Sequence, residues 1–541
     1  MKTLFGLIVA SALVIGCTDS AAERTGKSKK QKNISKRDKS INKSNSYSDL
    51  FMDSLVVERF ITEKKIPDSL ANRVRSFYNT RNFQFAWFSS DGLTEQARGF
   101  WNLHDYVTTY DVDSSLKNKT LQKKMDNLIA AEQLSVGAND KSFQNTELTL
   151  TEHFILYILH NYERGYVKRK EMERFIPRKK EDPLALADSL IHKKHKDDKY
   201  FEDVHQSYRA LKEQLAKYYD IAKKGGWPEV NIGKQKLKKG MVAPEVSVIK
   251  KRLEITGDMP AADTTQRFND TLELGIKNFQ QRHGYKPTGL ISDSLIKEMN
   301  VPAIYRVKQL LMNMDRMRWL TTNEVAGNLI LVNIPEFELH LYDGKQKVFD
   351  MDVVVGKEGH NTMMFNGDLN QVVFCPYWNV PPSIVTKEIL PALEKHPGYL
   401  EKENMEITGQ EDGLPVIRQR PGEKNALGRV KFLFPNSFNI YLHDTPAKSL
   451  FEKDKRAYSH GCIRLKEPEK LANYVLRNEP EWTPEKIEKA MNAGEQKFVK
   501  VKNPIPVLIT YYTAWVDDNG QLNFREDIYG HDSNLGSKMF F

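Results

Sequence analysis

The stretch HDTPAKSLFEKDKRAYSHGCIRL, residues 443–465, contains two histidines, His443 and His460, and a single cysteine, Cys462. Gly461 directly precedes the cysteine and permits a sharp backbone turn that leaves amide N–H groups free. The letters IYLHDTP are typical of a strand that ends in a turn, so a neighbouring strand could carry His443 to the sulfur. The pattern favours a reactive sulfur over a structural one.

A nucleophilic cysteine needs a base and a neighbourhood that stabilises negative charge. The thiolate is the reactive form, and cationic or hydrogen-bonding neighbours lower the thiol pKa toward working pH. Histidine and arginine flank Cys462 as His460 and Arg464. Histidine is also the side chain best suited to take the thiol proton near neutral pH, so His443 and His460 are the candidate bases. Free amides near Gly461 would face a developing oxyanion.

Two other interpretations of Cys462 are weaker. A lone cysteine is usually a small buried hydrophobe, but the combination His-Gly-Cys-Ile-Arg with a second histidine upstream favours a site. Zinc would need a fourth ligand at a familiar spacing, and the sequence has no CxxC or HExxH motif. We therefore predict no metal at Cys462.

The run SHGCIRL (459–465), preceded by YLHDTP, resembles the signature of the L,D-transpeptidases, enzymes with a YkuD-type catalytic domain that cross-link bacterial peptidoglycan. The resemblance extends upstream through NIPEFELHLYDG (333–344), VVVGK (353–357) and VVFCPYWNVPPSI (372–384). These segments are similar to strands and loops of the larger, capped members of that family. The motif in this chain is highly specific.

The resemblance implies a role for each residue of the motif. Cys462 would be the acylated nucleophile and His443 its proton acceptor and donor, with the backbone carbonyl of Asp444 orienting the imidazole. His460 and Gly461 would form the wall and oxyanion site. The residues that would contact substrate are Arg464, Ser459, Tyr377 and Trp378.

Residues 1–17 have the layout of a lipoprotein signal peptide, with one basic residue, an apolar run and the lipobox-like VIGC. We predict cleavage before Cys17, lipid attachment to its sulfur, and a protein anchored in the cell envelope facing the periplasm. An ordinary secretory signal is the alternative. Only Cys375 and Cys462 then remain, so no disulfide framework is expected.

Residues 18–48 are rich in Lys, Ser and Asn, a composition that predicts a disordered basic tether. From Glu23 to Ser48 nine basic residues oppose two acidic ones, which accounts for +7 of the chain's net charge of +10. Nucleic acid is a poor partner for an exported chain, so we expect no nucleic-acid binding.

Residues 49–235 carry helical periodicity and are predicted to form a helical scaffold domain. The aromatic run FYNTRNFQFAWF (77–88) is expected to lie in its core. Residues 241–300 resemble peptidoglycan-binding domain type 1, a small three-helix module, in the run FQQRHGYKPTGLI. Within it, His283 is expected to be an isolated surface histidine rather than a metal ligand.

The predicted fold is multidomain α+β. A connecting helix at 301–326 leads into a mainly β YkuD-like catalytic domain at 327–515, with a capping insertion at 378–429 and a C-terminal hairpin at 516–541. The letters LYDG predict a hairpin turn near Gly344. Thr483 is expected to cap a helix that Pro484 opens.

The resemblance implies an L,D-transpeptidase that forms 3-3 peptidoglycan cross-links through a cysteine thioester, needs no cofactor and is acylated by carbapenems. Its partners would be peptidoglycan peptide stems and, through the lipid anchor, a membrane; the sequence identifies no protein partner. Two alternatives stay open. The same site could act as an L,D-carboxypeptidase or endopeptidase, or the chain could be a non-catalytic peptidoglycan-binding lipoprotein.

Overall fold

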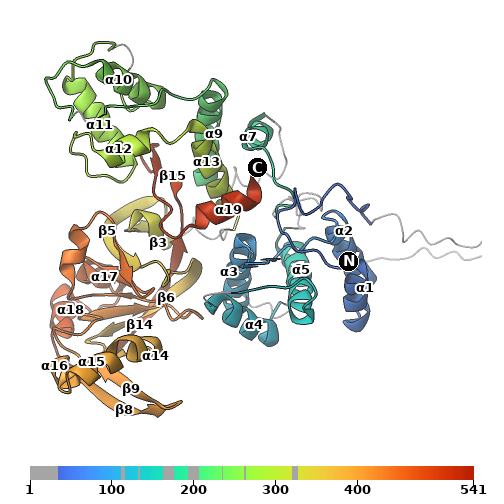
Figure 1. The fold of residues 1–541 in the computed structure, drawn as a ribbon. Helices are drawn as coiled ribbons and strands as arrows, with labels where there is room; N and C mark the ends of the chain where they lie inside the picture. The colour runs from blue at the N-terminus through green and yellow to red at the C-terminus, as the bar shows by residue number, and fades with distance from the viewer. Residues whose placement is uncertain are drawn as a thin grey trace, which may run out of the picture.

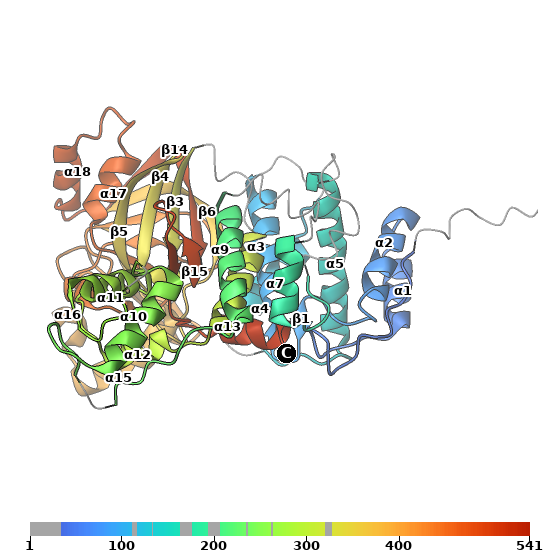
Figure 2. The same ribbon diagram turned by 90° about the horizontal axis from the view of Figure 1, so that it is seen from above.

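A helical N-terminal part and a mostly β C-terminal part make up the computed structural model, as the sequence predicts (Figure 1). Seen from above, α3 (Glu95–Tyr110), α9 (Gln206–Lys223) and α13 (Ala303–Met317) lie next to the β part, and the other scaffold helices extend away from it (Figure 2). The structure describes residues 34–110, 116–131, 134–162, 176–192, 206–233, 236–260, 263–319 and 327–541.

The C-terminal part is built on a nine-stranded sheet that closes on itself. Its order is β12-β5-β13-β11-β10-β6-β14-β3-β4, and β4 pairs back onto β5, so β12 is the one strand outside the ring. The strands are β3 (Asn328–Asn333), β4 (Glu338–Asp343), β5 (Gln346–Gly356), β6 (Phe365–Phe374), β10 (Val430–Leu433), β11 (Leu442–His443), β12 (Ala457–Ser459), β13 (Ile463–Leu465) and β14 (Lys497–Thr510).

Alternating apolar residues fill the interior of this ring. The predicted hairpin turn is confirmed, because Gly344 joins β4 to β5 with φ +58°, in the left-handed region that favours glycine. The sequence also predicts two separate strands, KFVKVK and IPVLITYYTAWV. The first run and the start of the second instead form the single strand β14, with a register shift between Lys500 and Ile505.

Two helices lie between β13 and β14 along the chain, α17 (Pro468–Val475) and α18 (Pro484–Met491). Thr483 caps α18 and accepts a hydrogen bond from the amide of Lys486, as predicted. Both helices contribute to the core of the barrel through Leu471 and Ile487.

The insertion between β6 and β10 has a small core of its own, formed by Val380, Ile384, Val385, Ile389 and Ile417. We call this segment, residues 378–429, the cap. It contains a three-stranded sheet in the order β7-β9-β8 beside short helices. Its elements are β7 (Trp378–Asn379), α14 (Pro382–Ile384), the π-helix η5 (Val385–Ile389), α15 (Leu390–Lys395), α16 (Tyr399–Lys402), β8 (Met405–Glu411) and β9 (Leu414–Gln419).

The scaffold region packs its helices around aromatic side chains. The prediction that residues 77–88 lie in the core is confirmed, since Tyr78, Trp87 and Phe88 are fully buried. The buried Glu147 accepts hydrogen bonds from the amides of Ala86 and Trp87. The helices are α1 (Ser54–Glu63), α2 (Asp68–Asn79), α3 (Glu95–Tyr110), α4 (Lys119–Ala130), α5 (Lys141–Tyr162), α7 (Pro183–His192) and α9 (Gln206–Lys223); two short strands, β1 (Phe88–Ser89) and β2 (Gly92–Leu93), complete it.

The prediction of a disordered tether through residue 48 is wrong for residues 34–48. Ile41 and Tyr47 are buried in the scaffold. The amide of Tyr47 donates to the carbonyl of Arg178 at 3.2 Å, and the guanidinium of Arg37 lies 4.8 Å from the ring centre of Phe83. The first part of the predicted tether, together with Cys17 and the signal peptide, lies outside the described residues.

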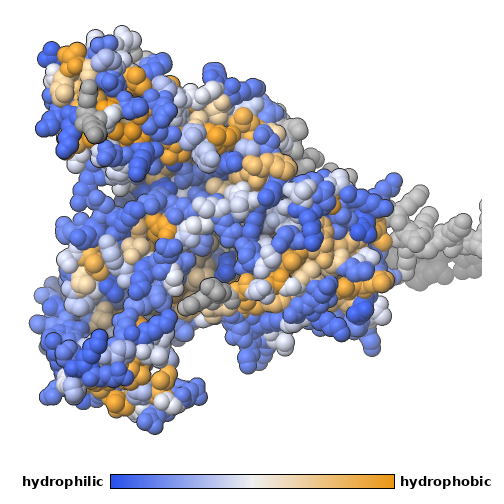
Figure 3. Space-filling view, viewed as in Figure 1, coloured by the Kyte–Doolittle hydropathy of each residue, from blue (hydrophilic) through white to orange (hydrophobic). Residues whose placement is uncertain are grey.

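The small module consists of α10 (Pro244–Thr256), α11 (Asp270–Arg282) and α12 (Asp293–Met299), which share a separate hydrophobic core. Val242, Leu274 and Leu290 are exposed on it. Figure 3 shows apolar patches among hydrophilic side chains over this module.

The prediction that His283 is a surface histidine is wrong. Its ring is buried and stacks between Phe279, at 4.0 Å between ring centres, and Phe524, at 5.3 Å. Burial and the neighbouring Arg282 lower the pKa of His283 to about 3. Because Phe524 belongs to the C-terminal hairpin, His283 joins the small module to that hairpin.

The chain after β14 forms a hairpin and then a helix, whereas the sequence predicts only a hairpin at 516–541. The hairpin pairs β15 (Ala514–Val516) with β16 (Leu522–Phe524), and α19 (His531–Met539) follows. The connecting helix is α13 (Ala303–Met317), in which the buried Arg316 pairs with Glu95 of α3 and Asp532 of α19 at 2.5 Å each. This ion-pair cluster joins the scaffold to the C-terminal segment.

Among the helices that the structure describes, none combines the length and the apolar character needed to cross a membrane.

Candidate active site

Cys462 lies in the turn between β12 and β13, on the rim of the barrel. The turn requires φ +111° at Gly461, a conformation that side chains with a Cβ rarely adopt. The cysteine is half-buried, and its sulfur lies 3.7 Å from the carbonyl oxygen of Asn439.

β11 and β13 are parallel neighbours, with Leu442 opposite Ile463 and His443 opposite Arg464. Leu442 and Ile463 are fully buried in the barrel core. Side chains alternate between the two faces of a sheet, so His443 leaves by the outer face, as does Cys462 one position before Ile463. The sheet thus brings the two predicted residues to one face of adjacent strands.

The imidazole of His443 is held by the next residue. Its Nδ1 lies 2.5 Å from the carbonyl oxygen of Asp444, so Nδ1 carries the hydrogen and Nε2 is left with a lone pair. The carboxylate of Asp444 accepts a hydrogen bond from the amide of Arg429 at 2.9 Å and pairs with Lys448 at 2.7 Å. Asp444 is therefore fixed on two sides.

The electrostatics favour a neutral base. Burial, and after it the positive charge of Arg464, lowers the pKa of His443 to about 3. An imidazole with this pKa is unprotonated throughout the physiological range and can accept a proton.

The cysteine is neutral at rest, which differs from the expectation that its neighbours lower the thiol pKa. Burial raises the pKa of Cys462 above its ordinary value and outweighs the opposing effects of Tyr441, Arg464 and Lys431. The site therefore holds a thiol and a neutral imidazole, so that the thiolate forms when the proton leaves for the base.

Tyr441 and Lys431 are functional candidates that the sequence reasoning missed. Tyr441 is two residues before His443 on the same face, and the two rings meet edge to face at 5.7 Å. Burial, and then the neighbouring Cys462, raises the pKa of Tyr441 far above its ordinary value, so its hydroxyl remains a donor. Lys431 lies opposite His443 on β10. The alternation along IYLH could have identified Tyr441, whereas Lys431 depends on the non-local pairing of β10.

Arg464 lies on the same face with a buried Nε that has no hydrogen-bond partner among the residues that the structure describes. Burial lowers its pKa, while the neighbouring Cys462 opposes this effect. Arginine remains charged even so, and an unpaired guanidinium N–H beside the sulfur is suited to an anionic group.

Ser459 and Gly461 stabilise the turn. The buried hydroxyl of Ser459 donates to the carbonyl of Cys462 at 2.5 Å and accepts from the amide of Gly461 at 3.1 Å. Ser459 thus acts inside the loop rather than as the substrate contact that we expected, and the amide of Gly461 is not free to face an oxyanion.

The side chain of His460 points to the cap rather than to the sulfur of Cys462. Its Nε2 pairs with Glu388 of η5 at 2.9 Å, and its ring lies 4.9 Å from that of His360. Tyr377 and Trp378 are half-buried at the base of the cap: the guanidinium of Arg418 lies 4.3 Å from the ring centre of Tyr377, and Trp378 packs against the core of the cap. The role of His460 in the wall of the site, and the substrate contacts of Tyr377 and Trp378, stay predictions.

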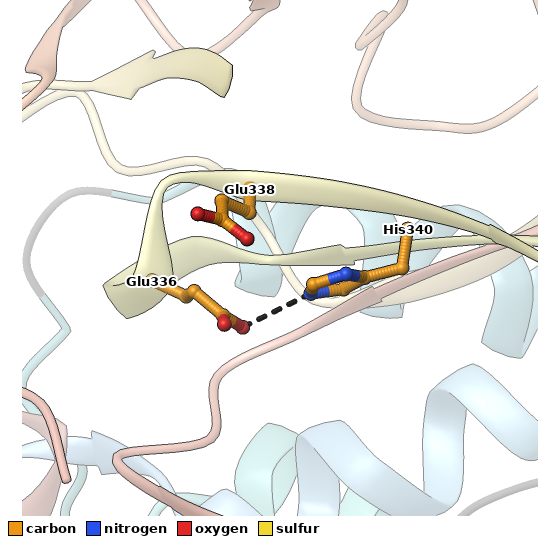
Figure 4. A group of neighbouring side chains, drawn as sticks. All are labelled: Glu336, Glu338 and His340. Carbon is orange, nitrogen blue, oxygen red and sulfur yellow. Dashed lines mark hydrogen bonds and ion pairs between the residues drawn. The ribbon is translucent and has the colours of Figure 1, made fainter. Parts of the chain in front are cut away.

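Glu336, Glu338 and His340 form a cluster of potential metal ligands (Figure 4). Both nitrogens of His340 are already paired, Nδ1 with Asp350 at 2.6 Å and Nε2 with Glu336 at 3.1 Å. These carboxylates outweigh burial and raise the pKa of His340 to about 10. A metal ligand must be a neutral imidazole with a free nitrogen, so the cluster is an ion-pair network.

The fold and the site together define a closed β domain that presents a cysteine and a histidine on one outer face. Residues 327–507 match the family model of the YkuD domain, described as the L,D-transpeptidase catalytic domain, and residues 72–215 match the model of the Scaffold domain. The chain therefore contains a YkuD-type L,D-transpeptidase catalytic domain, at residues 327–507.

Individual relatives match only part of the chain. A Haemophilus influenzae protein named as a candidate L,D-transpeptidase is 31% identical over 255 residues, which are 44% of this chain and 50% of that protein. The chain thus spans about half the length of the curated relative that it matches.

Among solved structures, an L,D-transpeptidase from Mycobacterium smegmatis is 13% identical, over 34% of this chain and 59% of that chain, with a TM-score of 0.19. An L,D-transpeptidase from Xylanimonas cellulosilytica is 10% identical, over 52% of this chain and 100% of that chain, with a TM-score of 0.17.

Proposed function

We propose that the protein is a cysteine-dependent L,D-transpeptidase that forms 3-3 cross-links between peptidoglycan stems. The observation that carries this proposal is the placement of Cys462 and His443 on one face of adjacent parallel strands, with Nδ1 of His443 held by the carbonyl of Asp444. This arrangement leaves the other imidazole nitrogen to exchange protons with the sulfur.

In the first half-reaction, the sulfur of Cys462 attacks the carbonyl of the third, diamino-acid residue of a tetrapeptide stem. The thiol proton moves to His443, and a tetrahedral oxyanion forms. The bond to the terminal D-alanine then breaks, and His443 returns the proton to the leaving amine. A thioester remains.

In the second half-reaction, the side-chain amine of a neighbouring stem attacks the thioester and gives its proton to His443. The carbon–sulfur bond breaks, the sulfur recovers a proton from His443, and an amide joins the two third residues. The unpaired Nε–H of Arg464 would bind a stem carboxylate beside the reacting carbonyl. No cofactor takes part in this proposed sequence.

The reaction products show whether an amine or water accepts the acyl group from the thioester. We expect purified disaccharide tetrapeptides, incubated with the protein, to yield dimers linked between two third residues, together with free D-alanine, as measured by chromatography and mass spectrometry. Tripeptide monomers without dimers would identify a carboxypeptidase, and loss of added dimers an endopeptidase. An unchanged substrate mixture would support the non-catalytic, wall-binding alternative.

We also propose that the protein is exported and anchored to a membrane through Cys17, because VIGC follows a signal-like apolar run. Cys17→Ala is expected to move the protein from the membrane fraction to the soluble periplasmic fraction, as measured by immunoblotting. Equal membrane retention of the variant and the unaltered protein would contradict the lipid anchor.

A further inference from the structure

The peptide bond between Gly461 and Cys462 is held at one end only. Its carbonyl oxygen, on Gly461, accepts a hydrogen bond from the hydroxyl of Thr362 at 2.8 Å. The N–H at its other end, on Cys462, donates to no acceptor among the residues that the structure describes. Because a peptide unit is planar with its C=O and N–H in opposite directions, the contact with Thr362 also fixes where this N–H points.

The hydroxyl of Thr362 has its direction set by its surroundings. Its oxygen accepts a hydrogen bond from the amide of Gly356 at 2.9 Å, so its proton is directed to Gly461. Its own amide donates to the hydroxyl of Tyr529 at 3.3 Å, and that hydroxyl donates to the carbonyl of Gly356 at 2.6 Å. Thr362, Gly356 and Tyr529 therefore form a closed set of hydrogen bonds behind the cysteine turn.

The surrounding backbone leaves Thr362 little room to move. Thr362 is only 2% exposed. A Cβ at Gly356 would meet the carbonyl oxygen of His360 at 2.0 Å, which shows how tightly this loop is closed. Gly461, in contrast, is a glycine with a positive φ, whose peptide could rotate if nothing held its carbonyl.

We propose that Thr362 is a positioning residue that aims the N–H of Cys462 at the oxyanion of the acyl-transfer intermediates. This inference rests on the proposed function, since an oxyanion forms only when the sulfur attacks a carbonyl. The amide of Gly461 already donates to Ser459, whereas the amide of Cys462, on the same residue as the sulfur, is a backbone donor that has no acceptor among the described residues. Through its hydrogen bond with Thr362, Tyr529 connects the cysteine turn to the C-terminal segment.

Two reactions of the Cys462 sulfur can distinguish the positioning of the oxyanion donor from a general distortion of the loop. A carbapenem acylates Cys462 when the carbon–sulfur bond forms, the lactam C–N bond breaks and the thiol proton passes to the ring nitrogen; this reaction passes through an oxyanion. Iodoacetamide alkylates the sulfur by displacing iodide from a saturated carbon, with the proton released to the buffer. No oxyanion forms in the second reaction.

The test compares the full-length protein with Thr362→Val, which removes the hydroxyl at nearly constant shape, and Thr362→Ser, which keeps it. We expect Thr362→Val to slow carbapenem acylation by about 100-fold and to change the alkylation rate by less than about threefold. Thr362→Ser is expected to retain acylation within about threefold of the unaltered rate. Stopped-flow absorbance and intact mass would follow the two reactions.

Equal losses in acylation and alkylation for Thr362→Val would overturn the proposal, because they would mean that the sulfur itself had moved. Unchanged acylation would overturn it as well. Failure of the proposed function has a different signature: the unaltered protein would then be alkylated at Cys462 but would neither form a carbapenem thioester nor process stems.

Discussion

Replacement of Cys462 by alanine is expected to abolish both cross-linking and the covalent carbapenem adduct. The sulfur is the atom that we propose to carry the acyl group in both half-reactions, and alanine cannot form a thioester. Intact-mass analysis after incubation with a carbapenem should show one adduct on the unaltered protein and none on Cys462→Ala. Cross-linked dimers should fall below detection, a loss of at least about 1,000-fold.

Cys375→Ala is the matched control for this experiment. Its sulfur is buried and lies 3.3 Å and 3.4 Å from the carbonyl oxygens of Ala490 and Met491, away from the turn of Cys462. The control variant is expected to acquire the adduct at nearly the unaltered rate. An adduct that persists in Cys462→Ala, or that disappears in Cys375→Ala, would contradict the assignment of Cys462 as the acylated cysteine.

Local sequence patterns predicted those parts of the barrel in which the paired strands are close together in the sequence. The alternation in residues 338–356, interrupted by a DG turn, is sufficient for the hairpin of β4 and β5. The closure of the ring through that same pair, and the parallel pairing of β11 with β13, join segments far apart in the sequence. The strand pattern of IYLHDTP showed only that His443 could reach Cys462, and the motif resemblance was needed to pair the two residues.

The same reason explains why Thr362, Tyr529 and Lys431 were missed. Thr362 lies 99 positions before Gly461, and Tyr529 lies 173 positions after Gly356, with which it shares a hydrogen bond. Their residue types carry no signal of chemistry by themselves. Contacts of this separation follow from the completed fold.

Average composition misled the prediction for residues 34–48. Lys, Ser and Asn dominate the segment, but its apolar residues Ile41 and Tyr47 are buried in the scaffold. The prediction for the pKa of the Cys462 thiol was wrong for a related reason. Counting cations near Cys462 predicted a lowered pKa, whereas burial is the larger effect and can be known only from the surroundings of the folded side chain.

Replacement of His443 by alanine is expected to reduce carbapenem acylation about 100- to 10,000-fold at pH 7, because the thiol then has no base. His460→Ala is the matched control, since His460 belongs to the same loop but pairs with Glu388 of the cap. We expect that control to retain acylation within about tenfold. A larger loss for His460→Ala than for His443→Ala would reverse the two assignments.

The pH profile provides the sharper part of this prediction. Burial and Arg464 lower the pKa of His443 to about 3, so the base stays unprotonated as pH falls from 7 to 5, and the unaltered protein should keep most of its acylation rate there. The variant must instead rely on spontaneous thiolate, whose fraction rises about tenfold per pH unit below the thiol pKa. Since burial raises that pKa, the variant's rate should climb steeply through pH 9, and the difference between the two proteins should narrow. Stopped-flow acylation measured from pH 5 to pH 10 would record both profiles, and parallel curves would mean that His443 does not take the proton from Cys462.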